Sequence, residues 1–169
     1  MNTKQLTDLL DQATQSGQLD LCGHQLTAWP ESIFALKNLQ GLYLDDNQLT
    51  TVPPDIAQLT QLQVLSLTGN QLTRLPPELA QLPDLQWLYL ACNQLTELPS
   101  AIAELSNLKV LSLANNHLTT LPKELTKLSN LKVLALDNNP LTSPPPEIIA
   151  QGTQAILTYL QLDVQVRIY

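Results

Sequence analysis

Leucines recur along the chain with a fixed spacing of 23 residues, and this spacing dominates the hydrophobic pattern. Six copies of the unit begin at residues 16, 39, 62, 85, 108 and 131, and the fourth reads LQWLYLACNQLTELPSAIAELSN. The common pattern is LxxLxLxxNxLxxLPxxIxxLxx, in which positions 4, 6 and 11 are leucine in every copy. A period of this length is typical of solenoids, in which each unit forms one coil and stacks on the next.

Within each unit, alternating leucines predict one short strand. In the fourth unit Leu88 and Leu90 are two residues apart, so both side chains point to the same side of an extended chain. Later apolar positions, such as Leu98 and Ile102, return the chain along an outer wall. One coil alone cannot bury these faces, whereas stacked neighbours do. Residues 16–153 therefore predict one continuous stack of six coils.

Both ends of the stack carry patterns that predict caps. Residues 1–15 are expected to form a helix. Its apolar residues are spaced so that they lie on one face: Leu6, Leu9, Leu10 and Ala13. At the other end, residues 154–169 predict a second capping region, with Thr153 placed to cap its helix. The final segment LDVQVRIY alternates apolar and polar residues and predicts a short strand after that helix.

The 23-residue unit resembles the leucine-rich repeat of the LPxx type, over residues 16–153. The resemblance implies an α/β solenoid, namely a right-handed leucine-rich-repeat superhelix with a parallel concave β-sheet, six coils and helical caps. A strand in each coil would form the concave sheet. Non-catalytic binding of proteins is the function that we expect from such a module.

Two polar columns and one proline column are predicted to be structural. Asparagine at position 9, where the strand turns, can pair buried backbone groups of its own and the adjacent coil; the column is Asn47, Asn70, Asn93, Asn116 and Asn139, with His24 in the first coil. Threonine at position 12 is expected to bond turn backbone through its hydroxyl; the column is Thr27, Thr50, Thr73, Thr96, Thr119 and Thr142. Proline at position 15 fixes φ where the chain enters the outer wall.

Residues able to carry catalysis or a metal are few and scattered. Cys22 and Cys92 lie three coils apart, which is too far for a disulfide, so we predict two free thiols. Cys22 and His24 form the one close pair of these types, without a third group to orient them. Zinc needs clustered nitrogen or sulfur ligands, and Cys and His total four in the whole chain. We therefore predict no enzymatic activity, no cofactor and no metal.

Charge and hydropathy narrow the expected partners. The formal net charge of −7 disfavours nucleic acid, whose phosphates require clustered Lys and Arg. No uninterrupted apolar run approaches the roughly 18 residues of a membrane span, so no membrane insertion is expected. Residues 1–17 are polar and lack the apolar region of a secretory signal, which predicts a cytoplasmic location. Acidic residues concentrate before residue 105, so the N-terminal part of the stack carries more negative charge than the C-terminal part.

Positions 3 and 5 of each coil flank the buried leucines and should face the concave surface. These columns hold unusually apolar residues, and lysines precede two of the strands. We predict that a protein or peptide binds there, on Tyr43, Val64, Trp87, Tyr89, Val110, Val133, Lys109 and Lys132. Exposed Trp and Tyr are enriched in binding hot spots, and monomers rarely expose such apolar stripes without use.

Two alternative functions follow from the C-terminal part. The run NPLTSPPPEIIAQGTQAILTYLQ, residues 139–161, resembles the end of the repeat domain in Roco-type proteins, where a Ras-like GTPase domain follows. The chain contains no G-x-x-x-x-G-K-S/T phosphate-binding string, so a regulatory role in a Roco-like GTPase system is the alternative, not GTPase activity. The other is a structural protein that self-associates through a strand edge from Val164 to Tyr169.

Overall fold

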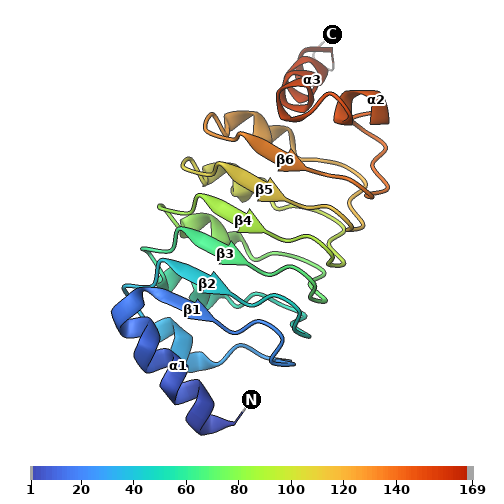
Figure 1. The fold of residues 1–169 in the computed structure, drawn as a ribbon. Coiled ribbons are helices and arrows are strands. Elements are labelled where there is room, and N and C mark those ends of the chain that lie inside the picture. The colour runs from blue at the N-terminus through green and yellow to red at the C-terminus, as the bar shows by residue number, and fades with distance from the viewer. Residues whose placement is uncertain (1, 167–169) are drawn as a thin grey trace.

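The computed structural model describes residues 2–166 as one stack of coils with helices at both ends (Figure 1). The chain begins with α1 (Thr3–Ser16) and ends with α2 (Pro146–Ile149) and α3 (Thr153–Val166). Each coil contributes one strand: β1 Gln18–Asp20, β2 Gly41–Tyr43, β3 Val64–Ser66, β4 Trp87–Tyr89, β5 Val110–Ser112 and β6 Val133–Ala135. Five coils return through a 3-10 helix: η1 Glu31–Ala35, η2 Pro54–Gln58, η3 Pro77–Gln81, η4 Ser100–Glu104 and η5 Lys123–Lys127.

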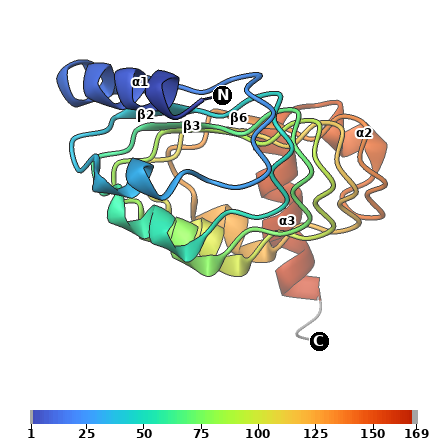
Figure 2. The ribbon, with the colours of Figure 1, turned by 90° about the horizontal axis from the view of Figure 1, so that it is seen from below.

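The strands form a single parallel sheet in the order of the sequence, β1 to β6. Its register follows the repeat, so that Trp87 pairs with Val64 on one side and Val110 on the other. Figure 2 shows the 3-10 helices as a wall opposite this sheet. The predicted solenoid, with one strand per coil in a parallel sheet, is confirmed.

Leucine side chains fill the space between the sheet and the outer wall. Leu88 in β4 and Leu90 in the loop after it are fully buried. The equivalent leucines of the neighbouring coils are fully buried as well. At position 11 the column is buried in the four inner coils, but Leu26 and Leu141 at the two ends are only partly buried. The core is therefore continuous along the stack and thins at its ends.

The asparagine column forms the predicted ladder of hydrogen bonds. In the second coil the Asn47 amide donates to Leu21 O of the preceding coil at 2.8 Å and to Leu44 O of its own coil at 2.9 Å. Its carbonyl oxygen accepts the N–H of Leu26 at 2.8 Å. Each asparagine thus bridges backward to the coil before it, and His24 stands in the one coil that has no predecessor.

The threonine column behaves differently from the prediction. All six side chains are exposed, and the one recorded hydroxyl bond within the column is from Thr142 Oγ1 to Thr119 O at 3.1 Å. Water reaches these exposed hydroxyls, so they need no backbone partner. The prediction that the column bonds turn backbone was therefore wrong except at Thr142. Proline at position 15 does precede each outer-wall helix, with φ of −73° at Pro53.

The N-terminal helix α1 lies over the first coil. A capping box begins it, in which the Gln5 N–H donates to Asn2 Oδ1 and the Asn2 N–H donates to Gln5 Oε1. Gly17 ends it with a φ of 69°, a conformation that glycine adopts without steric cost. Ala13, a residue of this helix, is fully buried. Helix α1 thereby covers apolar surface that the first coil would otherwise expose.

The C-terminal end differs from the predicted cap helix followed by a strand. Helix α3 continues to Val166, so the strand prediction was wrong for residues 162–166, and residues 167–169 lie outside the described residues. The Thr153 hydroxyl accepts the N–H of Leu134 in β6 at 2.8 Å, where a further strand would otherwise pair. Extending an existing helix avoids a new nucleation cost, which favours helix over an added strand. Self-association through a strand from Val164 to Tyr169 therefore loses its structural basis up to Val166.

Candidate protein-binding face

The predicted binding residues lie together on the outward face of the sheet, which we call the concave face. Position 3 forms a row across four neighbouring strands, from Val64 through Trp87 and Val110 to Val133. These side chains are partly buried, except Val133, whose side chain is 46% exposed. We call them the apolar row. Part of each of these residues remains accessible.

Two tyrosines stand beside the apolar row, in the next outward column. Tyr43 and Tyr89 both register with Ser66, which lies on the strand between them. Ser66 is buried and small, so the surface between the two tyrosine rings is lowered. Tyr43 and Tyr89 are themselves partly buried, as Trp87 is. Aromatic side chains therefore project from β2 and β4 on one accessible face.

The ammonium of a lysine lies over the Trp87 ring. The ammonium of Lys109 lies 5.3 Å from the centroid of that ring and donates to Gln86 Oε1 at 2.6 Å. A cation over an indole face is attracted by the ring quadrupole. Lys132 follows one coil later, and its N–H donates to Lys109 O at 2.8 Å. Both predicted lysines thus lie in the column next to the apolar row.

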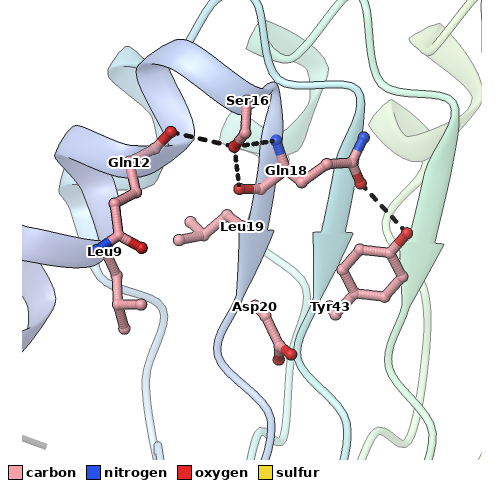
Figure 3. A pocket seen from close by; sticks show the side chains of 7 residues that line it. All are labelled: Leu9, Gln12, Ser16, Gln18, Leu19, Asp20 and Tyr43. Carbon is pink, nitrogen blue, oxygen red and sulfur yellow. Dashed lines mark hydrogen bonds between the residues drawn. The ribbon is translucent and has the colours of Figure 1, made fainter.

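The N-terminal end of the concave face is polar. Tyr43 donates its hydroxyl hydrogen to Gln18 Oε1 at 3.2 Å (Figure 3). The Gln18 amide lies over Gly41, where a Cβ would overlap it. A hollow of about 380 Å³ opens between α1 and β1, lined by Leu9, Gln12, Ser16, Gln18, Leu19, Asp20 and Tyr43. This end therefore offers hydrogen bonds, in contrast to the apolar row.

The Asp45 carboxylate, near the polar end of the face, is engaged in hydrogen bonds. Its Oδ1 accepts the Ser66 hydroxyl at 2.6 Å and the Thr68 N–H at 2.7 Å. Its Oδ2 accepts from the Cys22 thiol at 3.5 Å. Asp45 therefore bridges three consecutive coils. The 23-residue spacing places Cys22, Asp45 and Thr68 at the same position of three consecutive coils, so the sequence already contained part of the signal for this bridge.

The Cys22 thiol is protected from ionisation. Burial raises the pKa of Cys22 to about 12, and the Asp20 carboxylate also raises it. The pKa of Asp20 is itself lowered, mainly because its carboxylate accepts the backbone N–H of Cys22. A nucleophilic cysteine requires the thiolate. Cys22 beside His24 is consequently a thiol held in its neutral form, not an activated nucleophile.

We expect the two free thiols to react at very different rates. Cys92 is exposed, whereas Cys22 is partly buried with its raised pKa. At pH 8 iodoacetamide should modify Cys92 first, and mass spectrometry of the digested protein measures both sites. In urea the two sites should react alike, which provides the control. Equal rates in the folded protein would contradict the described environment of Cys22.

Because the pKa of Cys22 is raised in the folded chain, the free energy of unfolding should fall as the pH rises in the alkaline range. The unfolded chain ionises Cys22 near its ordinary pKa, while the folded chain keeps it protonated up to about 12. The resulting stabilisation is complete below the unfolded pKa and is lost as the pH rises through the interval between the two values. Cys22→Ser, with no ionisable thiol, should flatten that part of the stability profile.

Within residues 2–166, no group of three or more His, Cys, Asp or Glu side chains is placed to hold a metal ion. In the same part of the chain, no helix combines the length and hydrophobicity needed to cross a membrane. The concave face remains the principal candidate site.

Comparison with known proteins identifies the repeat. The profile of the family described as Leucine rich repeat matches residues 18–72, 37–95 and 83–141. Among curated proteins, none matches the chain. A solved leucine-rich-repeat protein from Leptospira interrogans is 37% identical, with a TM-score of 0.71, over 83% of this chain and 43% of that protein. This chain thus spans less than half of that relative.

Two similar structures from Arabidopsis thaliana are of complexes. One is the leucine-rich-repeat ectodomain of the membrane receptor kinase GASSHO1/SCHENGEN3 with CASPARIAN STRIP INTEGRITY FACTOR 2, 34% identical, TM-score 0.67, over 76% of this chain and 17% of that chain. The other is the BIR3–SERK2 complex, 33% identical, TM-score 0.64, over 75% of this chain and 70% of that chain. With the profile matching most of its coils, the chain belongs to the leucine-rich-repeat family.

Proposed function

We propose that this chain is a non-catalytic interaction module whose concave face binds an extended protein segment or peptide. The observation that carries the proposal is the apolar row with its flanking aromatics. Trp87, Tyr43 and Tyr89 sit on the accessible side of the sheet, where the core does not need them. Large aromatic side chains on an accessible surface are the commonest anchors of protein interfaces.

The size of the apolar row suits an extended segment. Four neighbouring parallel strands at about 4.8 Å spacing span about 14 Å. An extended chain advances roughly 3.4 Å per residue, so four or five residues of a partner cover the row. The Lys109 contact orients the Trp87 ring before binding. Such preorganisation lowers the entropy lost when a complex forms.

The comparisons support this proposal at the level of the family. Two similar structures are recorded in complexes, one with CASPARIAN STRIP INTEGRITY FACTOR 2 and one as a BIR3–SERK2 pair. We extend only the general capacity to bind a protein or peptide to this chain. A regulatory role in a Roco-like GTPase system stays a prediction, since neither the fold nor the similar structures test it.

A peptide-display selection tests the proposed function. The wild-type chain is used to select binders from a random 12-residue library, and the affinities of the selected peptides are then measured. Trp87→Ala combined with Tyr89→Ala should weaken these peptides about 30-fold, the loss typical of a hot spot. Both side chains are partly exposed, so thermal unfolding should change little.

Tyr159→Ala provides the matched control. It removes one partly buried ring from the groove between α2 and α3, away from the apolar row. Selected peptides should bind this variant as they bind the wild type. Unchanged affinity for the double variant, or a selection that yields no binder, would remove the concave face as the recognition surface.

A further inference from the structure

Lys109 differs from the other described cations in its surroundings. Its side chain is partly buried, whereas the remaining lysines and Arg74 among residues 2–166 are exposed. The ammonium contacts Gln86 Oε1 at 2.6 Å and faces the Trp87 ring. Neither partner carries a net negative charge. Lys109 therefore brings an unneutralised positive charge to the edge of the apolar row.

This charge retains capacity for a ligand. An ammonium has three N–H donors, and Gln86 accepts one of them. Within the described residues Lys109 forms no ion pair. A partly desolvated charge is costly unless an opposite charge compensates it. An incoming carboxylate would supply that compensation and two acceptor oxygens.

Lys132 adds a second positive charge in the same column. Its N–H donates to Lys109 O, so the two residues lie in adjacent coils, about 4.8 Å apart along the stack. Lys132, like Lys109, directly precedes its strand, and its exposed side chain brings a second positive charge to this part of the stack. Neighbouring like charges repel, and an anion bound between them relieves that repulsion. Val133, the most exposed member of the apolar row, stands next to Lys132.

We infer that the partner segment carries an aspartate or glutamate that binds Lys109 and Lys132, with adjacent apolar side chains packing on Trp87, Val110 and Val133. This inference rests on the proposed function and adds the chemistry of the ligand. The carboxylate of the partner segment binds at the β5–β6 end of the concave face. At the opposite end the negative charge of Asp20 repels a carboxylate, so the segment binds in one direction.

The overall charge selects an acidic protein segment over a polyanion. The chain has a formal net charge of −7, so nucleic acid or an anionic membrane would be repelled over most of the surface. A single carboxylate placed between two lysines avoids that repulsion. Burial of the neighbouring apolar side chains then supplies the remaining affinity.

Variants that each remove one charge, from the chain or from a selected peptide, test the inference. Each acidic peptide is compared with its Asp→Asn or Glu→Gln version by fluorescence anisotropy. Lys109→Gln should weaken the acidic version about tenfold and the neutral version much less. Lys127→Gln removes the same charge from an exposed position on η5, at the outer wall, and should leave both affinities unchanged.

The outcomes separate the inference from the proposed function. Peptides without Asp or Glu that still need Trp87 and Tyr89 would overturn the inference and leave the proposed function intact. Equal weakening of acidic and neutral peptides by Lys109→Gln would mean that Lys109 only positions the Trp87 ring, which also overturns it. Competition by inorganic phosphate at matched ionic strength would reveal a general anion site and overturn recognition of a carboxylate. If the selected peptides bound the Trp87→Ala and Tyr89→Ala double variant as tightly as the wild type, both the inference and the proposed function would be wrong.

Discussion

Replacing Asn93 with alanine should lower the free energy of unfolding by about 3 kcal/mol or more. The Asn93 carbonyl accepts the N–H of Leu72 at 3.0 Å, and its amide donates to Leu67 O at 2.9 Å and Leu90 O at 3.1 Å. The side chain is 6% exposed, so water cannot readily replace these bonds. Each buried backbone group left unpaired costs about 1–3 kcal/mol. Urea unfolding followed by circular dichroism measures the loss.

Asn139→Ala is the matched comparison, because it removes the same bonds at the open end of the ladder. Asn139 accepts from Leu118 N and donates to Leu113 O and Leu136 O. Its side chain is only partly buried, so water can occupy part of the vacated space. The expected loss is roughly 1 kcal/mol. If both variants lost the same stability, burial would not be what makes the inner asparagines valuable.

The repeated positions were predictable because each inner coil has nearly identical neighbours. Leu88 and Asn93 occur in environments that the sequence reproduces every 23 residues, so spacing alone indicates which side chains point inward. The ends lack that redundancy. Residues 162–166 alternate like a strand, but α3 already supplies a helix to extend, and Thr153 satisfies the exposed N–H of β6. The alternation of apolar and polar residues predicts neither the extension of α3 nor the hydrogen bond made by Thr153.

Side-chain pairings on the face were only partly predictable. The columns placed Lys109 near Trp87, but the rotamers that bring its ammonium over the ring depend on packing that the sequence pattern does not encode. The contact of Gln18 with Tyr43 depends likewise on the missing Cβ of Gly41. Asp45 is the opposite case, since the 23-residue spacing alone sets it beside Cys22 and Thr68 of the adjoining coils.

Leu88→Ala should destabilise the chain by about 2–5 kcal/mol, the range found when a buried leucine is cut back and its cavity only partly closes. Leu88 is fully buried in β4 and registers with Leu65 and Leu111 on either side. The cavity therefore weakens two coil interfaces at once. Val133→Ala also shortens a strand side chain, but at an exposed position on the edge strand, and should cost less than about 1 kcal/mol.

The location of Leu88 also predicts how the stack loses cooperativity. A solenoid holds together through contacts between neighbouring coils, so a defect in the middle divides it into two shorter stacks. Trp29 reports on the first coil and Trp87 on the fourth, and single-tryptophan versions of the Leu88→Ala protein separate the two signals. We expect the Trp87 signal to change at lower urea than the Trp29 signal. Coincident transitions would show that coupling between coils outweighs the defect, so that the chain still unfolds as one unit.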